Sequence, residues 1–323
     1  MSWEVEHDPP VLVEVVRCGL VESSHRGHVA VLDGTGLLTH QLGEVTKPRF
    51  GRSVLKPVQA AALVAAGLDL PEPQLALVAG SHPGAPFHVD GVRDILAGAG
   101  LDESALRNAP APPLGAAEAA DHLRAGHKPT AVVAGCSGKH AGMLATCVAN
   151  GWPRSGYLDP DHPVQRAIQD RLTRLSGEQP PVVGVDGCGA PTFALSLSGL
   201  ARAFRHLVLA PPGSPERRVA DALRAHPEFA TGPDRVDARL MSAVPGLVAK
   251  DGAEGFCAAA LPDGRAVAVK VDDGGLRAVE PLMVLALRLA GLDSQALPEP
   301  AYSPVLGGDT PVGAIRRTSL RDR

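Results

Sequence analysis

Both ends of the chain carry short apolar runs bounded by turn-forming residues, a pattern that predicts β-strands. The Asp33-Gly34 pair separates two of these runs and favours a hairpin, and Pro262-Asp263-Gly264 does the same near the C-terminus. The predicted strands are residues 11–20, 27–33, 36–42, 254–261 and 265–271. The last segment, 302–317, is predicted to be irregular and to end in an edge strand.

The middle of the chain instead spaces its apolar residues as helices do, and it is rich in alanine. The first helix is predicted over residues 53–67, with Ser53 at its N-cap and Gly67 at its C-terminal end. Further helices are predicted at residues 88–99, 103–107, 115–125, 138–150, 163–175, 191–204, 214–226, 234–242 and 278–291.

This order of elements predicts an α+β fold in which both chain ends contribute to one antiparallel sheet. The sheet is expected from about residues 10–45 and 254–317, with the helical region, about 53–242, packed beside it. A chain of 323 residues with 45% hydrophobic residues can bury one large core. We therefore expect a single domain over residues 1–323.

Charge and composition narrow the classes of partner. The formal net charge of −4 and an aromatic content of 3% argue against nucleic-acid binding. No window approaches the roughly 18 uninterrupted apolar residues of a membrane span. The acidic N-terminus does not resemble a signal peptide, and the five cysteines lack the spacing of a disulfide scaffold. We expect a cytoplasmic protein with reduced thiols and without a nucleic-acid or membrane partner.

Lysine is rare in this chain, accounting for six of its 31 lysine and arginine residues. Lysine can lose its proton and act as a base or a metal ligand, whereas arginine cannot, so the positions of the lysines are informative. Lys56, Lys139 and Lys270 lie in segments that suggest chemistry. The alternative is that codon usage removed most lysines and left a few on solvated faces.

Ser53 and Lys56 lie three residues apart at a predicted helix start, so their side chains share one face. The helix N-terminus disfavours the ammonium form of Lys56. A neutral lysine there can take the serine proton, and the serine can then attack a carbonyl carbon. The alternative is a capping serine followed by a solvated lysine.

Three further residues suggest a site. Lys270 is predicted on a strand, either as an edge lysine that discourages aggregation or as a second cation over an active site. Cys136 and Cys188 are flanked by glycines, follow strand-like runs and precede predicted helices, where thiolates are good metal ligands. Two cysteines with one nitrogen ligand would leave an open position on zinc; alternatively, both cysteines are small buried residues in tight turns.

Together these motifs resemble the rhizobial-type (class 3) L-asparaginases of the asparaginase II family. The resemblance spans roughly residues 10–317, and Val54 departs from it because serine is usual there. The matching segments, in the family's order, are residues 52–57, 81–82, 136–144, 185–194, 250–255 and 268–274.

The resemblance implies a serine β-lactamase-like fold, related to penicillin-binding proteins, and catalysis by two Ser–Lys pairs. Ser53 would be the nucleophile with Lys56 as its partner, Ser81 would relay protons, and Lys270 would support the second pair. The resemblance also implies a homodimer. A zinc ion would be bound by Cys136, Lys139 and Cys188, and the substrate's charged α-groups would contact Arg52, His140 and Asp186.

We therefore expect an amidohydrolase that converts L-asparagine to L-aspartate and ammonia through a serine acyl-enzyme. One alternative is another Ser–Lys amidase or acyl transferase of the β-lactamase-like superfamily. A second alternative is a non-catalytic, zinc-stabilised amino-acid-binding protein, in which the cysteines matter and Ser53 does not.

Overall fold

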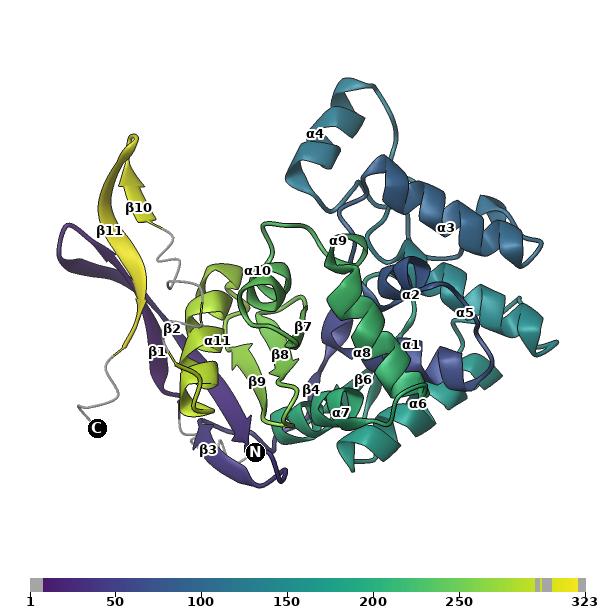
Figure 1. The fold of residues 1–323 in the computed structure, drawn as a ribbon. Helices are drawn as coiled ribbons and strands as arrows, with labels where there is room; N and C mark the ends of the chain where they lie inside the picture. Colours follow the sequence, from purple (N-terminus) through teal and green to yellow (C-terminus); the bar gives the residue numbers. More distant parts are fainter. Residues whose placement is uncertain (1–7, 294–296, 298–303, 319–323) are drawn as a thin grey trace, which may run out of the picture.

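The computed structural model describes residues 8–293, 297 and 304–318, and it places an antiparallel sheet beside a helical region (Figure 1). The main sheet has the strand order β10-β11-β1-β2-β9-β8-β7, with β3 also paired to β2. Its strands are β1 (Val11–Arg17), β2 (Leu20–Leu32), β3 (Leu38–Leu42), β7 (Val248–Asp251), β8 (Phe256–Ala260), β9 (Ala266–Val271), β10 (Pro304–Gly307) and β11 (Thr310–Arg317). The predicted α+β architecture, with a sheet built from both chain ends, is confirmed.

The central strands are buried on both faces because a helix covers each face. Side chains at alternate positions of β9 belong to two different apolar clusters, Ala266 and Ala268 to one and Val267 and Val269 to the other. The first cluster includes α7 (Leu197–Leu209), and the second includes α11 (Val279–Leu289). This period-two alternation is the one that the sequence predicts for the strand.

The other helices lie mostly to one side of the sheet, several of them against α1, whereas α10 packs on β7 (Figure 1). They are α1 (Lys56–Ala65), α2 (Glu72–Ala79), α3 (Pro86–Gly98), α4 (Ala116–Arg124), α5 (Ser137–Ala149), α6 (Pro163–Ser176), α8 (Pro215–Ala225), α9 (Pro227–Ala230) and α10 (Val236–Ala243). A small second sheet lies among them, formed by β4 (Arg49–Phe50), β6 (Pro191–Leu195) and β5 (Val183–Val185) in that order. None of the helices in the described ranges combines the length and the apolar character that a bilayer crossing requires.

Several predictions of local structure were wrong. The predicted helix over 191–204 begins as the strand β6, because pairing with β4 and β5 outweighs local helix propensity. Helix α7 starts only after Ser196, whose hydroxyl accepts a hydrogen bond from the Gly199 N–H. The predicted strand 11–20 is divided by a turn at Cys18 and Gly19, both with positive φ, and residues 20–26 continue into β2. The run before Cys136 is a turn rather than a strand, and residues 103–107 form only a short 3₁₀ turn, Glu103–Ala105.

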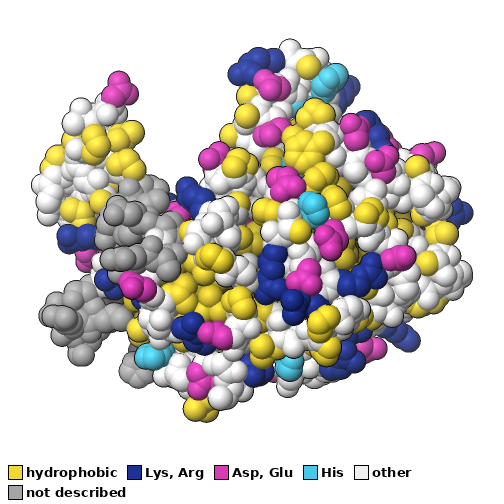
Figure 2. Space-filling model, in the orientation of Figure 1, with side chains coloured by type: hydrophobic (Ala, Val, Ile, Leu, Met, Phe, Trp, Pro, Cys, Tyr) yellow, Lys and Arg dark blue, Asp and Glu magenta, His cyan; other side chains and the backbone are white. Residues whose placement is uncertain are grey.

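The molecular surface mixes charges of both signs. On the face shown in Figure 2, acidic and basic side chains are interspersed over the helical region. The hairpin β10–β11 and the turn between β1 and β2 project away from the body of the protein (Figure 1). Apart from Lys270 on β9, the residues with predicted chemistry lie instead near the place where β7 and η1 (Arg52–Leu55) meet the helices.

Candidate active site

Ser53 lies in the 3₁₀ turn η1, immediately before helix α1. It is not an N-cap, because the turn begins after Gly51 and no side chain caps it. Arg52, just before the serine, has a φ of 50°. Left-handed backbone is uncommon for a residue with a side chain and is found preferentially at functional sites. The turn holds Ser53 half-buried, one helical turn before Lys56.

Lys56 is buried, with 2% of its surface exposed, and it has only neutral hydrogen-bond partners. Its Nζ donates to the carbonyl oxygen of Gly80 at 2.7 Å, to Ser81 Oγ at 2.9 Å and to the carbonyl oxygen of Gly135 at 3.3 Å. Burial lowers the pKa of Lys56 to about 7, because the ammonium form has lost its water. A large fraction of Lys56 is therefore neutral near pH 7 and able to accept a proton.

The hydrogen bond of Lys56 joins it to Ser81 and not to Ser53. Ser81 is buried, and its N–H donates to the carbonyl oxygen of Ala230 at 2.7 Å, which fixes the loop after α2. Within the described part of the chain, the Ser53 hydroxyl has no hydrogen-bond partner. Lys56 is thus hydrogen-bonded to Ser81. Its spacing of three residues from Ser53 keeps the two side chains on the same face of the helix.

Lys270 is not placed beside Ser81, contrary to the role expected for it. It lies on β9, in the interior of the sheet, and β8 separates it from the edge strand β7. Its ammonium donates to the carbonyl oxygens of Val271 and Asp272 and lies 5.5 Å from the centre of the Phe256 ring. Because β9 is flanked by β2 and β8, the alternative role as an edge-strand lysine is also wrong.

Lys250 is the lysine at the sheet edge near the serines. It lies on β7 with 1% of its surface exposed, and its Nζ donates to Asp237 Oδ2 at 2.8 Å and to Asp251 Oδ1 at 2.6 Å. Burial opposes its charge, but the two carboxylates outweigh burial and raise the pKa of Lys250. Asp251 also pairs with Arg235 at 2.7 Å, so two cations and two anions form one buried cluster, which we call the Lys250 cluster.

The Lys250 cluster touches the segments that carry both serines. At the end of β7, a Cβ atom on Gly252 would lie 2.8 Å from the Val54 side chain, so this backbone packs directly on η1. On the other side, Thr231 Oγ1 donates to Asp237 Oδ1 at 2.7 Å, and the preceding residue, Ala230, is the acceptor for the Ser81 N–H. The sequence did mark Lys250, because residues 250–255 are one of the segments that match the family, but this match did not indicate a role for the lysine.

The predicted metal ligands Cys136, Lys139 and Cys188 come together. Cys136 precedes α5, Cys188 follows β5, and Lys139 Nζ donates to Cys188 Sγ at 3.3 Å. A hydrogen bond from the Cys136 thiol lowers the pKa of Cys188, and the nearby charge of Lys139 lowers it further. Burial opposes the charge of Lys139, but the sulfurs outweigh it and raise the pKa of that lysine. The arrangement therefore favours one thiolate beside one ammonium group.

His140 joins this group and is fully buried, although the resemblance implied contact with substrate. One ring nitrogen of His140 and the sulfurs of Cys136 and Cys188 all lie within 4.8 Å of one another, as the donors around a metal ion do. His140 Nδ1 lies 2.9 Å from the Tyr157 hydroxyl. Burial lowers the pKa of His140 to about 4. Within the described residues, His140 Nε2 has no hydrogen-bond partner.

Arg52 and Asp186 form an ion pair that is partly exposed to solvent, beside Ser53 and the cysteine group. Arg52 Nε donates to Asp186 Oδ1 at 2.6 Å, and the two side chains are 27% and 14% exposed. Asp186 Oδ2 lies 3.9 Å from Cys188 Sγ. The ion pair therefore links the turn that carries Ser53 to the cysteine group, and it retains a face that a small molecule can reach.

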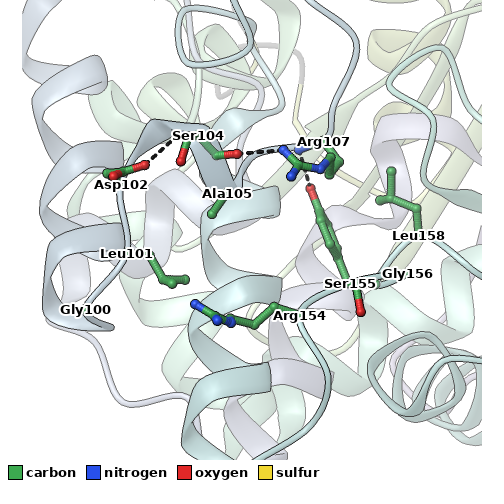
Figure 3. A pocket seen from close by; sticks show the side chains of 11 residues that line it. Gly100, Leu101, Asp102, Ser104, Ala105, Arg107, Arg154, Ser155, Gly156 and Leu158 are labelled. Carbon is green, nitrogen blue, oxygen red and sulfur yellow. Dashed lines mark hydrogen bonds between the residues drawn. The ribbon is translucent and has the colours of Figure 1, made fainter.

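A cavity of about 770 Å³ lies next to His140 of the cysteine group, and Figure 3 shows the residues that line it. Arg107 and Arg154 line this cavity together with Tyr157, but Ser53, Lys56 and Ser81 do not. Tyr157 links this cavity to His140. Its hydroxyl accepts a hydrogen bond from the Arg107 N–H at 3.0 Å and lies 2.9 Å from His140 Nδ1. Sequence reasoning missed Tyr157, which lies in an irregular loop where no periodic pattern or motif marks it.

Comparison with known proteins supports the family indicated by the motifs. The family model described as L-asparaginase II matches residues 13–317. No curated protein matches the sequence. Similar solved structures include a β-lactamase from Mycobacterium bovis, at 16% identity and a TM-score of 0.43, over 82% of this chain and 92% of that one. Mglu in its glutamate form is 17% identical with a TM-score of 0.44, over 83% of this chain and 62% of that one.

Structural likeness at these scores carries no argument about function, so the assignment depends on the sequence match. That match covers nearly the whole chain and includes each segment discussed above, from the turn with Ser53 to β9. The chain therefore belongs to the L-asparaginase II family, whose members are amidohydrolases that act on L-asparagine.

Proposed function

We propose that this L-asparaginase works through an acyl-enzyme formed on Ser53, with Lys56 as the proton acceptor. The observation that carries the proposal is the environment of Lys56. It is a buried lysine with neutral oxygen partners and a pKa of about 7, one helical turn from Ser53 and hydrogen-bonded to Ser81. A base with a pKa near the working pH is best suited to general acid–base catalysis.

The proposed reaction has two stages. Ser53 Oγ attacks the side-chain amide carbon of asparagine, and its proton passes to Lys56, directly or through the Ser81 hydroxyl. The carbon–nitrogen bond then breaks, and the proton held by Lys56 leaves with the departing ammonia. In the second stage, Lys56 takes a proton from water, the hydroxide attacks the ester, and Ser53 recovers its proton as aspartate leaves.

Two charged residues are proposed to hold the substrate. Arg52 suits the α-carboxylate, because a guanidinium can form paired hydrogen bonds with a carboxylate. Asp186 suits the α-ammonium group, and the existing Arg52–Asp186 contact would open to admit both charges. His140 is less suited to this role than expected, because it is fully buried among the cysteines.

Lys250 is proposed to take over from Lys270 as the second lysine of the site. Its two carboxylate partners keep it charged, so it would act as a fixed positive charge and not as a base. A fixed charge near Lys56 also disfavours the ammonium form of that residue.

The cysteine group is proposed to bind zinc through Cys136, Lys139 and Cys188. The donors fit, because two sulfurs and a lysine nitrogen converge in a buried position and soft thiolates favour zinc. A bound zinc ion would supply positive charge near the substrate's α-carboxylate. Metal analysis of purified protein beside Cys188→Ser tests this site, and equal zinc content in the two proteins would contradict it.

The remaining parts of the proposal come from the family resemblance and the composition. They are a single domain over residues 1–323, a homodimer, a cytoplasmic location, and the absence of nucleic-acid and membrane partners. The net charge of −4 supports the absence of a nucleic-acid partner. Sedimentation of the purified protein tests the dimer, and a monomer at micromolar concentration would contradict it.

Ser53→Ala tests the nucleophile. We expect ammonia release from asparagine to fall by roughly 10⁴-fold or more, because the acyl-enzyme cannot form. The matched control is Ser155→Ala, which removes an exposed loop hydroxyl and should retain wild-type activity. A Ser53→Ala protein with full activity would overturn the assignment, whereas wild type without ammonia release would overturn the activity itself.

A further inference from the structure

Arg52 and Glu254 share a rare backbone conformation and lie opposite each other beside the candidate nucleophile. Among the non-glycine residues that the structure describes, positive φ angles occur at Cys18, Arg52 and Glu254. Cys18 lies in the turn between β1 and β2, whereas Glu254 lies in the turn between β7 and β8. Glu254 Oε1 lies 4.0 Å from Arg52 Nη1. Two strained positions from distant segments therefore meet in one ion pair.

The backbone of Glu254 would suit a glycine, so the presence of a glutamate side chain there calls for an explanation. Its φ is 60°, a region that glycine enters freely and that is unfavourable for other residues. Within the described residues, Glu254 makes no polar contact closer than the one with Arg52, and its side chain is 65% exposed. The side chain therefore contributes little to the fold and is open to a ligand.

A second glycine-containing segment fixes the position of this carboxylate. A Cβ atom on Gly274, in the turn after β9, would lie 2.9 Å from Glu254 Oε2, so the carboxylate lies over glycine backbone. The carbonyl oxygen of Gly255 accepts a hydrogen bond from the Val271 N–H at 2.9 Å, which joins the two turns. Residues 250–255 and 268–274, both among the segments that match the family, thus position Glu254 together.

Arg52 lies between two carboxylates that differ in how far they are already bonded. Asp186 Oδ1 accepts hydrogen bonds from Arg52 Nε at 2.6 Å and from the Gly187 N–H at 2.8 Å. Glu254 lies at the other end of the guanidinium and is the more exposed of the two. An α-amino acid carries a carboxylate and an ammonium group on one carbon. A guanidinium beside an accessible carboxylate complements both of these charges.

We propose that Glu254 is a specificity-determining residue that binds the α-ammonium group of the substrate, while Arg52 binds the α-carboxylate. Glu254 thus adds a second carboxylate to the ammonium subsite proposed for Asp186. The inference rests on the proposed function and identifies the group by which the site selects α-amino-acid amides. An amide without that amino group leaves Glu254 unpaired and brings a second negative charge close to it, so the site disfavours such a substrate.

Hydrolysis of asparagine and of succinamate, which is asparagine without its α-amino group, tests this role. In Glu254→Gln, we expect kcat/KM for asparagine to fall about tenfold, mainly through KM, because a charge-assisted contact is lost. The value for succinamate should stay the same or rise, because a repelling charge has been removed. Asp309→Asn removes an exposed carboxylate from the β10–β11 hairpin and should keep the wild-type ratio. An equal fall for both substrates, or no change in either, would overturn the proposal.

Glu254→Gly separates substrate binding from a structural role. Glycine relieves the positive φ, so we expect urea unfolding with a midpoint equal to or above that of wild type. The preference for asparagine over succinamate should fall as it does in Glu254→Gln. A clearly lower midpoint would assign the side chain to the fold and overturn the proposal.

Binding without turnover distinguishes failure of this inference from failure of the proposed activity. Calorimetry compares L-aspartate with succinate, which is aspartate without its amino group. We expect wild type to bind aspartate more tightly, and Glu254→Gln to lose most of that preference. If wild type shows this pattern without releasing ammonia from asparagine, the proposed activity fails and the ammonium subsite stands. If wild type releases ammonia and Glu254→Gln keeps the full preference, the role of Glu254 fails alone.

Discussion

Lys56 and Lys250 are both almost completely buried, but their hydrogen-bond partners differ in charge. Lys56 and Lys250 are 2% and 1% exposed, respectively. Lys56 has a serine hydroxyl and two carbonyl oxygens as partners, whereas Lys250 has the carboxylates of Asp237 and Asp251. The pKa of Lys56 is lowered to about 7, and the pKa of Lys250 is raised.

The difference shows that burial alone does not make a lysine into a base. Burial disfavours the charged form at both positions, but only a nearby negative charge can offset it. Lys56 has dipoles without a full negative charge in direct contact, so it can lose its proton near neutral pH. Lys250 is held as an ammonium ion by Asp237 and Asp251. Two residues after it, Gly252 packs on the turn with Ser53. Lys56 is suited to accept a proton, whereas Lys250 is suited to provide a fixed charge and to balance its two buried carboxylates.

The same substitution at each lysine should therefore have different consequences, and the largest is expected at Lys56. In Lys56→Met, we expect kcat to fall by roughly 10²–10⁴-fold, because the proton acceptor is lost. The free energy of unfolding should change by about 1 kcal/mol or less, since only hydrogen bonds to neutral groups are removed. Ammonia release and urea unfolding measure the two effects. A large loss of stability with activity preserved would reverse the proposed roles.

Lys250→Met should mainly affect stability. Removing one partner from a buried ion pair leaves carboxylates uncompensated, and we expect a loss of about 3–5 kcal/mol in the free energy of unfolding. Urea unfolding measures this loss, with Lys56→Met as the matched control. Adding Asp237→Asn should recover part of the loss, because it removes one of the unpaired charges. A loss below about 1 kcal/mol would contradict the role of the cluster.

The pH dependence of catalysis tests the comparison without changing the chain. Lys56 acts as a base in its neutral form, so kcat/KM should fall roughly tenfold per pH unit below its pKa and reach a plateau above it. The expected midpoint is about 7, the lowered pKa of Lys56. Lys250, whose pKa is raised, stays charged throughout this range and should contribute no inflection. A flat profile between about pH 5.5 and 8.5 would argue against Lys56 as the base.

The sequence predicted most of the sheet because its strands alternate in the ordinary way, but it missed the edge strand. Val248–Asp251 is short and half of its residues are charged, which usually indicates solvent exposure. In the folded protein both charged residues are buried and paired, Lys250 with Asp237, 13 positions away, and Asp251 with Arg235, 16 positions away. Because the sequence did not predict β7, it assigned to Lys270 the role of the lysine at the sheet edge.

The candidate site was predictable where its residues share a motif and not where distant segments meet. Cys136 and Cys188 were identified from their glycine-flanked turns, and Ser53 and Lys56 from their spacing. The bond between Lys56 and Ser81 depends on how α1 and the loop after α2 pack, which no local pattern encodes. Tyr157 contacts His140 from an irregular loop, so nothing in the sequence marked it.

Lys270→Met should have the smallest effect, and it tests whether the second lysine has been assigned correctly. The ammonium of Lys270 contacts the carbonyl oxygens of Val271 and Asp272, at the end of β9 and in the turn after it, and the Phe256 ring on β8. Losing an ion–ring contact and these bonds should cost about 0.5–1 kcal/mol of stability and change activity by less than about threefold. Asparagine hydrolysis and urea unfolding, measured beside Lys250→Met, give the comparison. If Lys270→Met lost activity as Lys56→Met is expected to, Lys270 would have to reach the serines in a conformation other than this one, and the second Ser–Lys pair would be Ser81 with Lys270.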